Sequence, residues 1–265
     1  MALKGRLRAA FFMGASGGRL VPDVPMKRLS FLLFCVLGLM ACTTLEPSSS
    51  NVPAPAGPWQ AWQTFELPGK RHTDYQTRDE GGRSVVHAQA DRSASMFRRQ
   101  VRIEPAQLSR VQFSWRVANL IADADLSDAD VSDSPVRLVF AFDGDHAKLS
   151  ARNRMLFDLA QVLTGEPPPY ATLMYVWDNR AGTESVILGP RTDRIRKIVL
   201  ESGAAHLGQW LHYERDLRAD FKRAFGEDPG PLIGVALMTD ADNTGSRASG
   251  QYGEVRLLAR DGTPL

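Results

Sequence analysis

The sequence predicts an all-β domain, a jelly-roll-like β-sandwich with one longer and one short inserted helix. Three observations predict it. Most segments between residues 59 and 260 alternate in polarity or are rich in β-branched and aromatic residues. Turn-forming residues separate them at short intervals, and about nine or ten short strands in one domain are typical of sandwiches. The region spans roughly 200 residues, which fits one sizeable core.

The predicted strands are short and share this composition. They span residues 85–90, 99–103, 111–117, 136–142, 171–177, 184–188, 194–200, 232–238 and 254–258. Residues 178–183 are polar and include a glycine, so they predict a hairpin between the strands at 171–177 and 184–188.

Two segments show a helical period instead. Residues 145–163 place four leucines near one face, as in an amphipathic helix, and Gly165 with the prolines after it ends the segment. The four are Leu149, Leu156, Leu159 and Leu163. Residues 217–225 predict a short helix that stops at Gly226.

A secretory signal begins at Met26. Two basic residues follow it, residues 29–40 are almost wholly apolar, and the small Ala41 precedes Cys42. This apolar segment rises about 18 Å as a helix, which is short of a hydrocarbon core of roughly 30 Å. It therefore predicts export rather than a permanent membrane span.

Residues 39–42, Leu-Met-Ala-Cys, resemble the bacterial lipobox, in which the cysteine is acylated and the chain is cleaved before it. Met40 departs from the pattern, which usually has a smaller residue there. The resemblance implies a membrane anchor through a lipid on Cys42. In lipoproteins generally, a non-acidic residue such as Thr43 favours the outer membrane, on the periplasmic side. An ordinary signal peptide with an accidental cysteine is the alternative.

These features divide the chain into four parts. Residues 1–25 are interpreted as a misassigned start, with a genuine tail as the alternative, and residues 26–41 as the signal peptide. Residues 42–58, rich in Pro, Ser and Ala, are interpreted as a tether. Residues 59–260 are the β-sandwich domain.

The expected mature chain, residues 42–265, is acidic although the whole chain carries a formal net charge of +2. Residues 1–41 hold six of the 32 basic and one of the 30 acidic side chains, so 26 and 29 remain and the net charge is −3. The basic surplus belongs to the precursor and gives no support for nucleic-acid binding. Cys35 leaves with the signal and Cys42 takes the lipid, so no disulfide is expected.

A family resemblance rests on several stretches: residues 133–137, 141–145, 170–177, 194–199, 208–210, 214–216 and 238–244. They resemble the uncharacterised domain-of-unknown-function family 3047. The resemblance covers most of residues 59–258 and implies an exported bacterial protein with a β-sandwich and no established activity. The last third also resembles jelly-roll carbohydrate-binding modules, through Trp210 and the strands that follow it, a pattern that many unrelated sandwiches share.

The strand at 171–177 suggests a ligand contact. With a period of two, Leu173, Tyr175 and Trp177 share one face. If this face is concave, the two aromatic rings can stack on the apolar side of a sugar while other strands add charged groups. The candidate ligand contacts are Arg137, Asp143, Tyr175, Trp177, Asp178, Arg196 and Glu201. The alternative is that Tyr175 and Trp177 are core residues, as most strand aromatics are.

Residues 240–245 resemble the start of a calcium loop, in which alternate oxygen ligands precede a glycine. The candidate ligands are Asp240, Asp242 and Asn243. Gln251 stands where an EF-hand needs a bidentate glutamate, so the hypothesis is a small structural calcium site. The alternative is a polar turn whose side chains cap their own backbone.

No catalytic motif supports an enzyme. The expected mature chain, residues 42–265, lacks HExxH, GxSxG, the P-loop and the dinucleotide fingerprint, although it holds enough acids for a pair of glycosidase carboxylates. The sequence therefore favours a non-catalytic module that binds a glycan at the bacterial envelope. The alternatives are a carbohydrate-active enzyme, hydrolase or lyase, on the same fold and an envelope structural or protein-binding lipoprotein.

Overall fold

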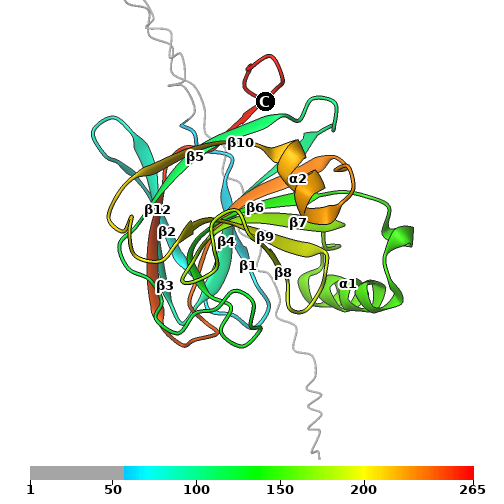
Figure 1. Ribbon diagram of the computed structural model, residues 1–265, viewed down its shortest axis with the longest axis horizontal. Coiled ribbons are helices and arrows are strands. Elements are labelled where there is room, and N and C mark those ends of the chain that lie inside the picture. The colour runs from blue at the N-terminus through cyan, green and yellow to red at the C-terminus, as the bar shows by residue number, and fades with distance from the viewer. Residues whose placement is uncertain (1–56) are drawn as a thin grey trace, which may run out of the picture. The chain divides into compact units, whose positions relative to one another are not determined.

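The structure is a computed structural model that describes residues 57–265 (Figure 1). The expected start at 1–25, the signal at 26–41, the lipidation site Cys42 and nearly all of the tether at 42–58 lie outside these residues. Between residues 57 and 265, every helix is too short or too polar to span a bilayer.

This part of the chain contains thirteen strands, two α-helices and one 3₁₀ turn. The strands are β1 (Gln63–Glu66), β2 (Asp74–Asp79), β3 (Ser84–Asp91), β4 (Ala94–Ile103), β5 (Arg110–Val117), β6 (Ser134–Phe142), β7 (Ala171–Asp178), β8 (Val186–Leu188), β9 (Ile195–Ser202), β10 (Leu211–Asp216), β11 (Leu232–Asp240), β12 (Arg247–Tyr252) and β13 (Arg256–Leu258). The helices are η1 (His146–Lys148), α1 (Ala151–Thr164) and α2 (Leu217–Phe225).

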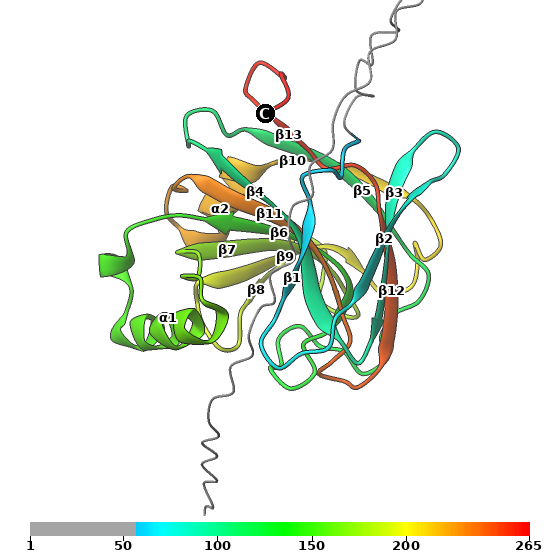
Figure 2. The same cartoon turned by 180° about the vertical axis from the view of Figure 1, so that it is seen from behind.

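The strands form two sheets that pack face to face (Figure 1, Figure 2). The seven-stranded sheet has the order β1-β4-β11-β6-β7-β9-β8, and the six-stranded sheet has the order β10-β5-β12-β3-β2, with β13 paired to β5. Neighbouring strands are antiparallel except β7 and β9, which are parallel. This architecture confirms the predicted jelly-roll-like sandwich with one longer and one short helix.

The core lies between the sheets because the strands alternate. On β5, Val111, Phe113, Trp115 and Val117 are buried, and the residues between them are partly exposed. The Phe113 ring stacks on the ring of Tyr175 from β7, with centroids 5.7 Å apart, and meets Trp115 edge-on at 5.2 Å. These contacts bury the apolar face of each sheet and so supply the main stabilisation of the fold.

All nine predicted strands are present, and the structure adds β1, β2, β10 and β12. Three of the added strands, β1, β2 and β10, lie at sheet edges. Edge strands bury few side chains, and β2 reads Asp-Tyr-Gln-Thr-Arg-Asp with no fully buried residue. Such a segment lacks the apolar alternation by which sequence analysis detects a strand.

The hairpin predicted at residues 178–183 is wrong. β9 lies between β7 and β8, pairing with β7 in parallel and with β8 in antiparallel fashion. β9 buries four consecutive residues, whereas β8 is short and has no buried residue. The apolar strand therefore takes the inner position, and the short one takes the edge.

The helix predicted at 217–225 is confirmed as α2. The Asp216 side chain accepts a hydrogen bond from the third residue of the helix, and Gly226 ends it in the left-handed region with φ of 74°. Phe221 anchors the helix on the core by packing against Phe142, with ring centroids 4.5 Å apart.

The helix predicted at 145–163 divides in two. Leu149 is buried in an extended conformation after η1, and Ser150 then begins α1 as its N-cap. Because of this break, α1 turns a different face to the core from the one that a continuous helix would present. Leu159 and Leu163, expected to share a face with Leu149, are exposed.

Gly250 of β12 lies where the two sheets approach too closely for a side chain. A Cβ atom added there would overlap Val136 Cγ1 and lie 2.6 Å from the Pro135 carbonyl oxygen. We expect Gly250→Ala to lower the free energy of unfolding by about 1–3 kcal/mol in urea denaturation, because the sheets must separate locally. The control is Gly234→Ala on β11, where the nearest atom would lie 3.6 Å away and the stability should not fall. Equal losses in the two variants would contradict the close approach.

Candidate functional site

The structure places the two predicted aromatic contacts, Tyr175 and Trp177, in the core. Their exposed fractions are 0% and 1%. The Tyr175 hydroxyl donates to Asp220 Oδ2 at 2.7 Å, and Trp177 Nε1 donates to the Gly203 carbonyl at 3.0 Å. Since β7 is an inner strand whose core side is covered by the other sheet, a ligand on the surface does not reach these rings. The core alternative therefore replaces the predicted contact.

Four other predicted ligand residues do not converge on one site. Asp178 accepts two backbone N–H groups in the turn after β7. Glu201, near the end of β9, accepts hydrogen bonds from a tyrosine and a histidine. Arg196, at the start of β9, donates to a backbone carbonyl. Asp143 lies after β6 and forms an ion pair of 3.4 Å with an arginine of β4.

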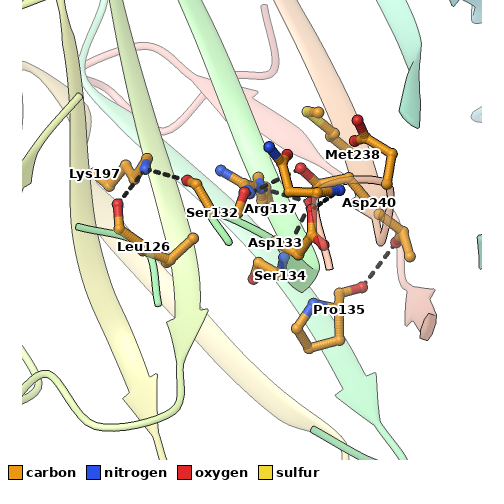
Figure 3. A network of polar contacts seen from close by, with 12 residues as sticks. Leu126, Ser132, Asp133, Ser134, Pro135, Arg137, Lys197, Met238 and Asp240 are labelled. Atoms are coloured by element: carbon orange, nitrogen blue, oxygen red, sulfur yellow. Dashed lines mark hydrogen bonds and ion pairs between the residues drawn. The ribbon is translucent and has the colours of Figure 1, made fainter. Parts of the chain in front are cut away.

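Arg137 forms a buried ion pair with Asp240 (Figure 3). Its Nε and Nη2 atoms donate to the two carboxylate oxygens at 2.9 and 2.8 Å, and Nη2 also donates to the Ser132 carbonyl at 2.6 Å. The two side chains are only 4% and 5% exposed. A forked, buried pair of this kind joins β6 to β11 and engages two of the three guanidinium nitrogens of Arg137.

Lys197 belongs to the same interior polar network (Figure 3). Its Nζ atom donates to the Leu126 carbonyl at 2.6 Å and to Ser132 Oγ at 2.9 Å. Burial lowers the pKa of Lys197 to about 7, an effect that the nearby Arg137 charge reinforces. Burial also raises the pKa of Asp240 to about 6 against the opposing effect of Arg137. The network thus holds the loop before β6 on the outer side of the seven-stranded sheet.

An acidic cluster, Asp133, Asp240 and Asp242, includes two of the three predicted metal ligands. One carboxylate oxygen from each lies within 4.8 Å of the others, so the cluster could hold a metal ion. The third predicted ligand, Asn243, instead donates its side-chain amide to the carbonyl of Ala129 at 3.1 Å.

The same carboxylates already have cationic and backbone partners. Asp240 binds Arg137, and Asp242 binds Lys70. Asp133 accepts the backbone N–H groups of residues 243 and 244, at 3.2 and 2.7 Å. The backbone of this turn is therefore capped by Asp133 from the loop before β6, whereas the alternative to a metal site expected the turn's own side chains to cap it.

A groove lined by both polar and apolar groups lies on the outer face of the six-stranded sheet, and we call it the outer groove. Its first part, of about 840 Å³, is lined by Gln112, Ser114, Trp210, His212 and Glu214, together with residues at the start of β3 and around β13. Its second part, of about 390 Å³, is lined by His87, Gln89, Arg116, Ser249 and Gln251, together with neighbouring small residues.

Strand alternation and register create this surface. Phe113 and Trp115 point into the core, so Gln112, Ser114 and Arg116 point to the outside of β5. Cross-strand pairing then sets Gln251 of β12 opposite both Arg116 and His87. On the other side of β5, His212 and Glu214 stand opposite Ser114 and Gln112.

A hydrogen-bond network organises the second part of the groove. Glu80 Oε1 lies 2.6 Å from His87 Nε2, and Glu80 Oε2 lies 3.7 Å from the Arg116 guanidinium. Gln251 accepts from Arg116 and donates to Glu80 at 3.4 Å. Four polar side chains are thus fixed against one another on an accessible face.

Trp210 lines the first part of the groove and lies under Arg116, which lines the second part. The Arg116 guanidinium lies over its ring, 5.2 Å from the centroid. Trp210 is partly exposed, whereas the other four tryptophans are buried. The groove therefore offers an amphipathic ring beside directed donors and acceptors.

Glu214 lies in the first part of the groove, where it accepts hydrogen bonds from Gln112 and Arg110, each at 2.7 Å. The bond from Gln112 and the charge of Arg110 lower the pKa of the Glu214 carboxyl. These contacts stabilise the carboxylate, which accepts hydrogen bonds and is a poor proton donor.

The sequence singled out only Trp210 among the groove residues, through the resemblance to carbohydrate-binding modules. Two more groove residues could have been found from the sequence. His87 and Arg116 occupy polar positions of strands that were correctly predicted. Gln251 carried no such signal because β12 was not predicted.

The fold and the groove define the chain as a β-sandwich protein with a groove on the outer face of one sheet. The chain belongs to the family described as "Protein of unknown function (DUF3047)", which matches residues 60–256. This match confirms the resemblance found in the sequence. No curated protein matches the chain.

Several solved structures are similar to this chain. One, titled "CBM4 structure and function", has 9% identity and a TM-score of 0.35, and the match covers 79% of this chain and 93% of that chain. The xyloglucanase domain of NopAA from Sinorhizobium fredii, in complex with cellobiose, has 5% identity, a TM-score of 0.36 and coverage of 76% and 96%. The low-affinity xylan binding module CBM86 from Roseburia intestinalis has 13% identity, a TM-score of 0.28 and coverage of 76% and 97%.

The buried ion pair predicts a large stability loss when one partner is removed. We expect Asp240→Asn to lower the free energy of unfolding by about 3–5 kcal/mol, because Arg137 remains buried with an uncompensated charge. The measurement is urea denaturation at neutral pH. The control is Asp91→Asn, which removes an exposed partner of Arg247 and should cost at most about 1 kcal/mol. Similar small losses in both variants would show that the interior network does not depend on the charge.

Proposed function

We propose that the protein is a lipoprotein of the bacterial cell envelope whose β-sandwich binds glycan without catalysing a reaction. The observation that carries the proposal is the outer groove, in which Trp210 and Arg116 lie beside imidazole, amide and carboxylate groups on one open sheet face. This groove takes the place of the strand at 171–177 as the ligand surface.

The chemistry of the groove suits a sugar chain. A sugar ring has an apolar side, which a partly exposed indole can cover, and hydroxyls at its edge that both donate and accept hydrogen bonds. His87, Gln251 and Glu80 supply fixed partners of both kinds. The first part of the groove, about 840 Å³, is within the size range of ligand sites, and the second part adds about 390 Å³ on the same sheet face.

A binding role fits the groove better than glycoside hydrolysis. A hydrolase needs a carboxylic acid that keeps its proton near neutral pH, opposite a second carboxylate. The lowered pKa of Glu214 is the reverse of what a general acid requires. The rival function is a carbohydrate-active enzyme, hydrolase or lyase, and the release of new reducing ends or unsaturated products from a bound glycan would establish it. An envelope structural or protein-binding lipoprotein would show neither glycan binding nor turnover.

In the proposed topology, residues 26–41 are removed on export, Cys42 carries the lipid on the periplasmic side of the outer membrane, and residues 42–58 are the tether. The sixteen residues from 43 to 58 span at most about 55 Å when fully extended. The domain would therefore reach glycans close to the membrane surface.

Glycan binding is expected to depend on Trp210 and Arg116. On a glycan array, residues 42–265 with Cys42→Ser should bind a defined subset of glycans. Trp210→Ala or Arg116→Ala should weaken that binding roughly tenfold or more, because each removes a central anchor of the groove. Arg102→Ala, which removes an exposed arginine elsewhere, is the control and should bind normally. Unchanged binding by both groove variants would contradict the site.

The anchor predicts covalent lipid on one residue. Cells that express the full chain with radiolabelled palmitate should yield a labelled protein in the membrane fraction. Cys42→Ser should abolish the label and the cleavage before residue 42, because the thiol is the acylated group. Cys35→Ser, within the signal, is the control and should be labelled normally. Label that persists in Cys42→Ser would exclude this anchor.

We also propose that the acidic cluster binds a calcium ion in the folded protein. Excess calcium should then raise the melting temperature relative to EDTA, because a ligand of the folded state stabilises it. Asp242→Asn should remove the rise, since it deletes one of the three carboxylates. An unchanged melting temperature in the unsubstituted protein would leave Arg137 and Lys70 as the cations that the cluster holds.

A further inference from the structure

α1 exposes an apolar stripe on the face opposite its packing surface. Met155, Leu159, Val162 and Leu163 have exposed fractions of 65%, 56%, 81% and 61%. Their spacing places them along one side of a helix. With Leu188, at 53%, they are the exposed large hydrophobic side chains of residues 57–265.

The stripe is not a poorly packed core face, because the other side of α1 is the one that packs. Asn153 is buried and hydrogen-bonds Asp193 at 2.6 Å, and Phe157 packs edge-on against the ring of His146. α1 lies at the margin of the domain, beyond β8 (Figure 1, Figure 2). The apolar stripe therefore points away from the sandwich.

Basic residues gather at the N-terminal end of the stripe. Lys148, Arg152, Arg154 and Arg191 are all exposed there, and Arg152 reaches the Arg191 carbonyl at 3.4 Å. Arg152 lies three residues before Met155 in α1, on the neighbouring turn, and it lines a shallow depression with Arg191, Leu188 and the acidic Asp193. Within α1 itself the only acidic residue is Asp158.

We propose that this face docks on a lipid bilayer with anionic headgroups. Apolar side chains on one face of a short helix enter the interface between headgroups and acyl chains, and adjacent arginines bind the phosphates. Helix α1 has 14 residues, so it is about 21 Å long and lies flat rather than spanning. The apolar stripe is complementary to lipid acyl chains, and the basic residues at its end are complementary to anionic headgroups. An anionic bilayer offers both kinds of group side by side, so we favour it over an acidic protein surface.

With the proposed lipid anchor, even a weak affinity of the stripe for lipid would be enough to keep α1 on the membrane. A tether of about 55 Å confines the domain near the membrane, which gives the stripe a high effective concentration of lipid. Docking is nevertheless a property of α1 and does not depend on glycan binding, so the two proposals fail separately.

The test is flotation of residues 42–265 carrying Cys42→Ser with vesicles of phosphatidylethanolamine and phosphatidylglycerol at 3:1, and with pure phosphatidylcholine vesicles. The substitution removes the lipid so that only the protein surface can bind. The protein should float with the anionic vesicles, and high salt and the zwitterionic vesicles should each reduce the bound fraction. A double variant, Leu159→Gln with Val162→Gln, should bind about tenfold or more weakly, because it removes two side chains that enter the interface.

Controls keep the result specific to the stripe. Asp158→Gln on the same helix should bind at least as well as the parent, since it removes a negative charge. The double variant changes only exposed positions, so its melting temperature and glycan binding should match those of the parent. Failure of the parent chain to float with anionic vesicles would overturn the proposal. Dimers in sedimentation equilibrium that the double variant abolishes would assign the stripe to a second copy instead.

Discussion

Phe113 and Trp115 of β5 pack with Tyr175 of β7 between the two sheets. This aromatic layer determines which side chains of the two strands point into the core and which point outward. Because strand residues alternate, burying the two β5 aromatics sends Gln112 and Arg116 to the outside. The same contact seals Tyr175 inside. The stability of the core and the composition of the outer groove are thus two results of one packing interaction.

The interior polar network adds a second constraint. The Arg137–Asp240 pair links β6 to β11, and Lys197 holds the loop before β6 through two hydrogen bonds. Buried charges cost desolvation, which the forked geometry and the backbone contacts offset. Groups that resembled ligand-binding or metal-binding residues in sequence are therefore used to organise the sandwich, and the outer groove is built from a different set of side chains.

Much of the fold could be predicted from the sequence because strand alternation and helix capping are local. Asp216 and Gly226 bound α2 where expected, and the long apolar strands appear at their predicted positions. The site could not be predicted to the same extent, because whether a side chain points into the core or to the surface depends on strands that are distant in sequence. Trp177 and Trp210 look equivalent in sequence, yet one is buried and the other is partly exposed.

The same limit explains the other corrections. The position of β9 between β7 and β8 depends on which of the strands is buried on both faces. Leu159 is exposed because the predicted helix is broken before α1, and the leucine spacing did not reveal this break. The outer groove combines β3, β5, β10 and β12, which are separated along the chain and meet only through the sheet register. No single stretch of sequence contains it.

In the proposed mode of binding, the glycan contacts the outer face of the six-stranded sheet, and the core aromatic residues stay inaccessible to it. The most direct measurement is an NMR titration of the five tryptophan indole N–H signals, using residues 42–265 with Cys42→Ser and a glycan selected on the array. The Trp210 indole signal should shift progressively with glycan concentration, while the signals of buried Trp115 and Trp177 should stay in place. Shifts at Trp177 with no change at Trp210 would contradict this mode of binding.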